Sequence, residues 1–530
     1  MKKYLYQNGF ISIRIILSIL VGVIVLGGIV GGVLYVARAP QKASTEKQEQ
    51  GRCGDGICQD VEKERGVCVD CNIKQGEETK NQENHTTQQP VQVDDDNSID
   101  ADGFLWGTET YPDKINQIKG VINETLKVSY VKNRIQMSMV TKDGKTFTEK
   151  SCLPSQLNCL KQNDLDEAAA LFKENNWSMV PMFSHDPSDK TIESSDIDSF
   201  VEFVDWFVSR YKDNANIKYI ELINAPASWW QGTDKQLVDL TNKVYDRMKK
   251  KYPDIMVGTP GFEYWNDIKE SGKGVDQLEY FLDKNNGAKF DFLAFHGYPL
   301  GIIKENIIYP PTSKARYTKL AGIYGLREIR KIFNANGWED RMIIDTEHTG
   351  LFATKPILSE SEYAADAAFM TQELLIKRTL QLDGKNILTG ILPFKVAPRG
   401  RTGEFTWASL KSDGSVTPAI RAVALLWSKL NSYNYSSHLS GDWDTESTPW
   451  VEKFTSGSDK DLYIFFKPFK YVSGKTISID NETLKYTLNL NRTPKSITLT
   501  DIEGNFSGVV VSKAITLEAV NAPKYIEIKY

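Results

Sequence analysis

The stretch Tyr219–Pro226 reads YIELINAP and shows how this chain is built. Its apolar residues are typical of a buried strand, and the strand is expected to end at Asn224, just before the proline. Similar short apolar runs recur along the chain. Together they predict eight strands: Phe104–Thr108, Lys127–Met137, Trp177–Ser184, Ile217–Asn224, Ile255–Thr259, Phe290–Phe295, Arg341–Thr346 and Ile387–Pro393.

Amphipathic helices are predicted between these strands. One has an apolar stripe at i, i+3, i+4 and i+7, formed by Phe200, Phe203, Val204 and Phe207. A capping box at Ser359–Glu362 opens another, which runs through Lys377, and the last helix spans about Pro418–Leu430. Eight strand–helix units predict a (β/α)8 TIM barrel over residues 99–432. The alternative, a doubly wound open sheet, lacks a GxGxxG turn after its first strand.

In such barrels the chemistry lies at the carboxyl ends of the strands. Here those ends carry carboxylates, aromatic residues and three of the five histidines of the chain. They are Glu109, His185, Asp186, Asn224, Glu263, Trp265, His296, Tyr298, Glu347 and His348. This convergence on one rim indicates a functional pocket. The spacing of a metal-binding HExxH motif is absent from the sequence, and no metal or cofactor is expected.

Four segments carry a resemblance to a known family. They are YIELINAP at 219–226, FHGYP at 295–299, IIDTEHTG at 343–350 and the closing stretch SLKSDGSVTPAIRAVALLWSKL at 409–430. In this order they resemble the clan-A retaining glycoside hydrolases, which include cellulases, β-xylosidases and iduronidases. The resemblance covers about residues 101–530 and implies a carbohydrate partner.

The resemblance also implies roles for individual residues. Glu347 takes the position of the nucleophile. Asn224 would hydrogen-bond the sugar hydroxyl next to the anomeric carbon, and Arg134 would pair with Glu347 and keep it ionised. His296 and Tyr298 would orient Glu347 or bind sugar, with rim packing as the alternative. Further substrate contacts are expected from the rim side chains His185, Trp229, Trp230 and Trp265, although the paired tryptophans could equally pack as a lid.

One position departs from the family pattern. Ala225 stands where the family has its acid/base glutamate. A retaining glycosidase needs two carboxyl groups, and a methyl group can neither donate a proton nor activate water. Glu221 lies four residues upstream, about 13 Å deeper along a regular strand, and is not an obvious substitute. Glu109, Asp186 and Glu263 are candidate replacement acids from neighbouring loops.

The N-terminal part predicts a membrane anchor. Residues 15–37 contain no charge and are long enough to cross a bilayer as a helix. We expect a single-pass anchor within residues 1–40, with the bulk of the chain outside the cytoplasm. The alternative is a signal peptide cut after Ala39.

Six cysteines favour an oxidising compartment. Four lie in a Cys-rich module at residues 51–72, and Cys152 and Cys159 form a second local pair. Disulfides are expected. A zinc site is the alternative for the first cluster, and Asp55, Asp60, Glu62 and Asp70 could hold calcium. The polar stretch 73–98 predicts a flexible stalk.

The remaining features complete the outline. Residues 436–530 predict an antiparallel β-sandwich, with short alternating strands in the runs DLYIFFKPF, SITLTDIEG, FSGVVV, AITLEA and KYIEIKY. The net charge of −5 argues against nucleic-acid binding. Two main functions stay open: a cell-surface glycoside hydrolase, and an inactive carbohydrate-binding or adhesion pseudo-enzyme. A purely structural surface protein is the third. A second carboxylate about 5–10 Å from Glu347 would favour the enzyme.

Overall fold

The computed structural model describes residues 99–137, 164–184, 194–263, 273–297, 322–347, 358–393, 396–398, 407–411, 413–441, 447–469 and 479–530. The predicted anchor, stalk and all six cysteines lie outside these residues. Among the residues that are described, no helix is long and apolar enough to cross a membrane.

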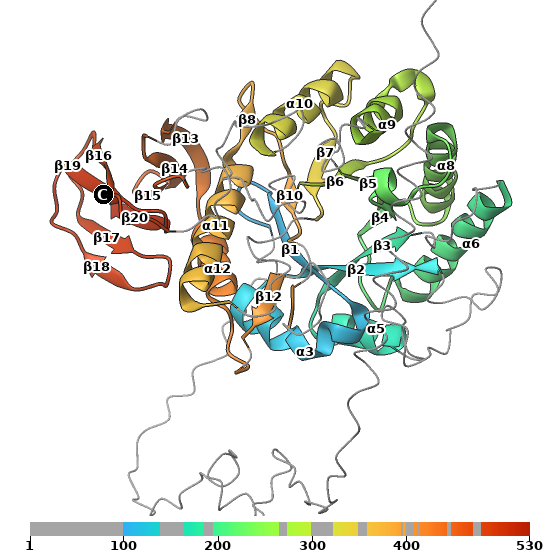
Figure 1. The fold of residues 1–530 in the computed structure, drawn as a ribbon, viewed down its shortest axis with the longest axis horizontal. Helices are drawn as coiled ribbons and strands as arrows, with labels where there is room; N and C mark the ends of the chain where they lie inside the picture. Colours follow the sequence, from blue (N-terminus) through green and yellow to red (C-terminus); the bar gives the residue numbers. More distant parts are fainter. Residues whose placement is uncertain are drawn as a thin grey trace, which may run out of the picture. The chain divides into compact units, whose positions relative to one another are not determined.

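Eight parallel strands close into a barrel in the order β1-β10-β7-β6-β5-β4-β3-β2 (Figure 1). Their bounds are β1 Leu105–Thr110, β2 Tyr130–Gln136, β3 Ser178–Ser184, β4 Tyr219–Asn224, β5 Met256–Glu263, β6 Phe292–His296, β7 Met342–Asp345 and β10 Gly390–Ile391. Each strand overlaps one of the eight predicted runs. The predicted (β/α)8 barrel is therefore confirmed.

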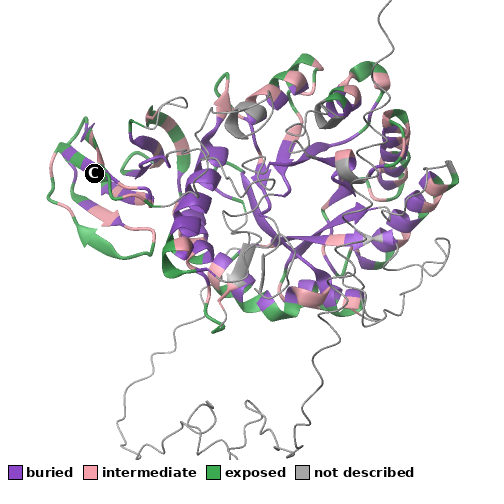
Figure 2. Cartoon of the chain, viewed as in Figure 1, coloured by how far each residue is buried: buried purple, intermediate pink, exposed green. Residues whose placement is uncertain are grey.

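Helices surround the barrel (Figure 1), and buried residues lie where helices and strands meet (Figure 2). Apolar side chains from both form one core cluster. They are α3 Ile115–Gly120, α5 Asp164–Glu174, α6 Ser194–Tyr211, α7 Pro226–Trp229, α8 Asp234–Lys251, α9 Lys273–Leu282, α10 Gly322–Ala335, α11 Glu360–Thr379 and α12 Pro418–Leu430. Short 3-10 or π-helical turns occur at Pro112–Lys114, Val121–Leu126 and Lys284–Asn286. The predicted capping box at Ser359 opens α11, because its hydroxyl accepts from the Glu362 amide while the Glu362 carboxylate accepts from the Ser359 amide.

The interior of the barrel is layered. Its lower layer is apolar and contains Leu105, Tyr130, Val180, Phe292, Ala294, Ile344 and Leu392. Alternate residues of a strand point to the same side. Further along this interior face, β1 carries Gly107 and then Glu109, β2 carries Lys132 and Arg134, and β6 carries His296. This change from apolar to charged side chains places the chemistry at the carboxyl ends of the strands.

Strand β4 is irregular at its carboxyl end. Its pairing with β5 shifts register between Ile220 and Leu222 and again between Leu222 and Asn224. Ile223 and Ala225 both have left-handed backbones, with φ of 44° and 45°. Such conformations cost a non-glycine residue roughly 1–2 kcal/mol each. They bend the chain sharply where the strand passes into α7.

The C-terminal part forms antiparallel sheets. A six-stranded sheet has the order β13-β14-β15-β20-β17-β18, and β16 pairs with β19. The bounds are β13 Asn434–Ser440, β14 Trp450–Ser456, β15 Lys460–Phe466, β16 Leu484–Asn489, β17 Ser496–Thr500, β18 Phe506–Gly508, β19 Ala514–Ala519 and β20 Lys524–Lys529. Apolar residues from both sheets form one cluster, as in a sandwich. Short pairs also form between β8 Gln381–Leu382 and β9 Lys385–Asn386, and between β11 Val396–Pro398 and β12 Trp407–Leu410.

Helix α11 connects the barrel to these sheets and is buried along most of its length. Its polar side chains find partners on the C-terminal sheets. Gln372 donates to the carbonyls of Lys467 and Asn521, and Thr379 donates to Glu452. The C-terminal sheets therefore pack against the barrel instead of standing apart from it.

Candidate functional site

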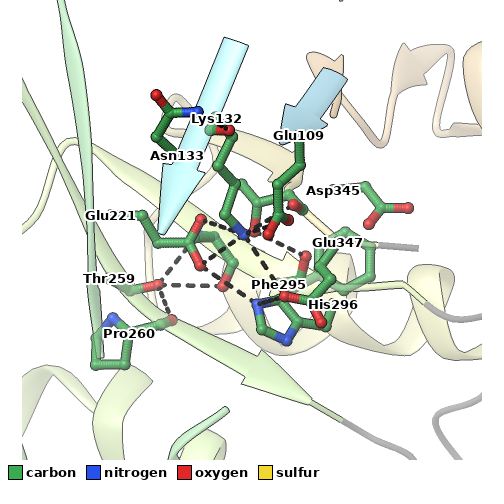
Figure 3. A network of polar contacts seen from close by, with 12 residues as sticks. Glu109, Lys132, Asn133, Glu221, Thr259, Pro260, Phe295, His296, Asp345 and Glu347 are labelled. Carbon is green, nitrogen blue, oxygen red and sulfur yellow. Dashed lines mark hydrogen bonds and ion pairs between the residues drawn. The ribbon is translucent and has the colours of Figure 1, made fainter. Parts of the chain in front are cut away.

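The centre of the site is a buried lysine surrounded by three glutamates (Figure 3). The Nζ atom of Lys132 lies 3.4 Å from Glu109 Oε2, 3.2 Å from Glu221 Oε2 and 3.7 Å from Glu347 Oε2. It also donates to the carbonyl oxygen of Thr346 at 2.9 Å. Lys132 is 0% exposed. A buried ammonium group is costly without partners, and here oxygens from three carboxylates and one carbonyl surround it.

The barrel strands explain this arrangement. Glu109 on β1 and Lys132 on β2 are directly paired in register, so their side chains share the inner face. Glu221 reaches the same centre from β4, and Glu347 directly follows β7. Burial lowers the pKa of Lys132, but the charges of Glu109, Glu221 and Glu347 outweigh it and hold that pKa above its ordinary value. The lysine is therefore a permanent cation.

His296 joins two of the glutamates at the end of β6. Its Nε2 lies 3.3 Å from Glu221 Oε1 and 3.7 Å from Glu347 Oε2. Burial lowers the pKa of the imidazole, but the charge of Glu347 and the hydrogen bond with Glu221 outweigh burial, so the pKa is raised. The ring is thus biased towards its protonated form.

Gly261 on β5 makes room for this contact. A Cβ atom at this position would lie 2.4 Å from both Glu221 Oε1 and His296 Nε2. Only glycine leaves these two side chains in place. Its carbonyl oxygen also accepts a hydrogen bond from the amide of Ala225 at 3.1 Å.

The next layer towards the rim contains Asn224 and Arg134. With the Asn224 amide oriented so that its nitrogen faces Glu347, it donates to Oε2 at 3.3 Å. Its oxygen then accepts from Arg134 Nη2 at 3.2 Å. Glu347 is therefore held by Asn224 from above and by Lys132 and His296 from below.

A second buried ion cluster supports the ends of β6 and β7. Lys377 on α11 contacts Asp345 Oδ2 at 2.7 Å and Glu373 Oε1 at 2.6 Å. It also donates to the carbonyl of Gly297, whose amide donates to Asp345 Oδ1 at 3.0 Å. Burial raises the pKa of Glu373 to about 7, while the charge of Lys377 opposes that rise. This cluster fixes the backbone next to His296 and two residues before Glu347.

The structure brings together four of the predicted site residues: Arg134, Asn224, His296 and Glu347. Ala225 is also adjacent, because it follows Asn224 and is buried. His185, Tyr298 and Trp265 lie outside the described residues, and so do the side chains of Trp229 and Glu263. Trp230 is buried and its indole nitrogen donates to the Thr233 carbonyl, so its position supports the packing alternative.

One expectation about the site is wrong. Arg134 was expected to pair with Glu347, but it contacts Asn224, and Lys132, two residues earlier on the same face of β2, is the cation beside Glu347. Glu221 was expected about 13 Å deeper than Ala225 on a regular strand, and that depth stays a prediction. Glu221 and Glu347 both contact His296 Nε2, so these two carboxylate oxygens are no more than about 7 Å apart, near the spacing of carboxyl pairs in glycosidases.

Sequence reasoning missed Lys132 and Gly261 altogether. The signal for Lys132 was its spacing of two residues from Arg134, which places both side chains on one face of a strand.

The chemistry of this site is that of carboxylates and their counter-ions. Within the described parts of the chain, no group of His, Cys, Asp and Glu side chains is arranged to hold a metal ion. The ammonium group of Lys132 occupies the centre of the glutamate cluster. Of the three glutamates, Glu347 is the most exposed at 7%, against 1% for Glu109 and 0% for Glu221.

Known structures share this fold. No family model matches the sequence, and no curated protein sequence matches it. A family 39 glycoside hydrolase from Bacteroides cellulosilyticus WH2 is similar with a TM-score of 0.59 at 16% identity, covering 80% of each chain. A monomeric β-xylosidase from Caulobacter crescentus CB15 has a TM-score of 0.50 at 15% identity, covering 82% of this chain and 96% of that one.

A bacterial orthologue of human α-L-iduronidase is also similar, with a TM-score of 0.51 at 10% identity over 80% of each chain. At these identities the likeness concerns the fold. The chain therefore has the (β/α)8 fold of these glycoside hydrolases, together with additional antiparallel sheets.

Proposed function

We propose that this chain is a cell-surface protein, held by an N-terminal membrane anchor, that acts on a carbohydrate through Glu347 as nucleophile. The observation that carries the proposal is the surroundings of Glu347. It is the most exposed of three clustered glutamates at the carboxyl ends of the barrel strands, and Lys132, His296 and Asn224 all contact it. The glycoside hydrolase fold supports a carbohydrate as partner.

The position of Ala225 limits the chemistry. Ala225 is buried, has a left-handed backbone and offers a methyl group at the position that the resemblance assigns to the acid/base glutamate. Loss of general acid/base assistance costs about 10²–10⁴ in rate. We therefore propose that the natural reaction uses a leaving group that departs without a proton.

The reaction would proceed in two steps. The Glu347 carboxylate forms an ester bond to the anomeric carbon while the bond to the leaving oxygen breaks, and the electron pair leaves with that oxygen. Water then attacks the anomeric carbon, the ester bond breaks and the water proton passes to solvent. Both steps balance without a second protein carboxylate, but the second is slow without a base.

Glu109 and Glu221 do not take over the missing role. Both lie close enough to Glu347 to meet the distance expected of a second carboxylate. However, both are nearly or fully buried and contact the ammonium group of Lys132. A salt-bridged carboxylate beneath the nucleophile is poorly placed to protonate a leaving group above it.

The test is hydrolysis of a panel of dinitrophenyl glycosides by the full-length chain. Turnover that disappears in Glu347→Ala supports the proposal. An Ala225→Glu variant serves as the matched comparison, because it should extend turnover to glycosides with poorer leaving groups by about 10²-fold or more. If neither the wild-type chain nor Ala225→Glu hydrolyses any member of the panel, that result contradicts a catalytic role for Glu347.

The buried Ala225 methyl group supports a second function, an inactive carbohydrate-binding protein. In that case sugars would bind at the same pocket without turnover. Isothermal titration with the sugar products of the panel separates the two: binding that persists in Glu347→Gln, together with absent hydrolysis, supports the binding protein.

A further inference from the structure

We propose that Lys132 is a positioning residue that keeps Glu347 ionised and fixes the segment carrying it. This inference rests on the proposed function in one respect, namely that Glu347 is the group whose charge matters. It concerns a residue outside the motifs that resemble glycoside hydrolases, and it rests on two independent contacts.

The first contact is electrostatic. The ammonium group of Lys132 lies 3.7 Å from Glu347 Oε2, with both groups withdrawn from solvent. An opposite charge within about 4–6 Å typically lowers the pKa of a carboxyl group by roughly 1–3 units. Bulk water, which would weaken this attraction, is excluded around the lysine.

The second contact is with the backbone. Lys132 donates its shortest hydrogen bond, 2.9 Å, to the carbonyl oxygen of Thr346, the residue directly before Glu347. The strand β7 ends at Asp345, and the Thr346 amide still donates to the Phe295 carbonyl of β6 at 2.9 Å, so the Thr346 peptide groups are held on both sides. Lys132 thus fixes the backbone directly before Glu347.

The remaining charged groups determine what happens when the lysine is lost. Those facing Glu347 and Lys132 are Glu109 from β1, Arg134 from β2 through Asn224, Glu221 from β4 and His296 from β6. On α11, Lys377 and Glu373 pair with Asp345 at the end of β7. Without Lys132, three carboxylates would share one imidazole, and like charges at this range cannot all stay ionised.

Glu109 and Glu221 complete the arrangement as counter-ions of Lys132. Lysine has three N–H donors, and the four surrounding groups use them without leaving the ammonium group to water. Arg134 does not replace Lys132 as the cation beside Glu347, because its guanidinium group donates to the Asn224 oxygen. The neighbouring barrel residues therefore keep Glu347 ionised whether or not a substrate is bound.

The experiment measures the protonation of Glu347 directly. Infrared spectra of the full-length chain are recorded across pH, and the spectrum of Glu347→Gln is subtracted, which isolates the carboxyl band of Glu347. This readout requires no activity, so a failure of the proposed function leaves it intact. We expect the titration midpoint to rise by about 1–3 pH units in Lys132→Met, again measured against its own Glu347→Gln partner.

Two further variants keep the test decisive. Lys132→Met leaves three glutamates together and could prevent folding, so Lys132→Met/Glu109→Gln removes one charge of each sign and should still raise the midpoint. Lys467→Met is the matched control, because Lys467 is also 0% exposed and paired with Asp480 and Glu482, but follows β15 in the C-terminal part of the chain. A midpoint that stays within about 0.3 units of wild type in the folded double variant would overturn the proposal.

Discussion

Replacing Glu373 by glutamine should make the protein less sensitive to pH. Glu373 is buried on α11, and its pKa is raised from 4.5 to about 7, chiefly by burial and against the charge of Lys377. A folded-state pKa above the unfolded value means that the folded chain binds this proton more tightly. The resulting stability is fully present below about pH 4.5 and is lost as the pH rises through 7.

The magnitude follows from the shift. One pKa unit corresponds to about 1.4 kcal/mol, so a shift from 4.5 to about 7 corresponds to roughly 3 kcal/mol of unfolding free energy. Glutamine has nearly the same shape and stays neutral. At pH 5 the wild type and Glu373→Gln should differ little, and at pH 8 the variant should be more stable by about 3 kcal/mol.

Urea unfolding at a series of pH values measures this difference. The control is Glu360→Gln, on the same helix, since Glu360 is 83% exposed and pairs with Lys411 at the surface. Its unfolding free energy should run parallel to that of wild type. If the curves of Glu373→Gln and wild type are also parallel from pH 5 to 8, the buried carboxyl does not carry the proton that we assign to it.

Three other perturbations test the site. Gly261→Ala should lower the free energy of unfolding by about 1–3 kcal/mol in a thermal unfolding experiment, because its Cβ would lie 2.4 Å from Glu221 and His296. Gly508→Ala is the control, because a Cβ there meets nothing within 4 Å. Equal melting temperatures for the two variants would contradict the close packing of Gly261 against Glu221 and His296. Ala225→Gly should stabilise the chain by up to about 1 kcal/mol by relieving its left-handed backbone, and a clear loss of stability would count against that strain. His296→Gln should destabilise the protein more at pH 6 than at pH 9 in urea titrations. The pKa of His296 is raised in the folded chain, so its protonation contributes stability that is lost as the pH rises through that pKa. An equal loss of stability at both pH values would refute this assignment.

The architecture of the barrel could be predicted because its signals are local. Each of the eight strands is a short apolar run between helical patterns, and each was found. The capping box at Ser359 and the helix Pro418–Leu430 were identified for the same reason. Three strands of the C-terminal sheets were missed: β13, β14 and β16. In β13 and β16 most residues are polar or partly exposed, so neither forms the apolar run on which the prediction relied.

The site was harder to predict because its contacts join segments that are far apart along the chain. The positions of Asn224 and Glu347 followed from the motifs, whereas the closeness of Glu221 to Glu347 depends on how β4 and the end of β7 come together in the barrel, which no local pattern reveals. Lys132 was missed since a lysine within a strand is usually solvent-exposed. Its burial makes sense only with three glutamates from β1, β4 and the end of β7, which are up to 238 residues apart along the chain.

The central claim is that Glu347 is a working nucleophile in a site without its acid/base partner. The most direct measurement is the intact mass of the full-length chain after incubation with deoxyfluoro glycosyl fluorides, whose leaving group needs no proton. We predict the added mass of one glycosyl group, located on the peptide that contains Glu347 and absent from Glu347→Gln. The same added mass on another residue, or an unchanged mass with every glycosyl donor while Ala225→Glu also stays unlabelled, would contradict the claim.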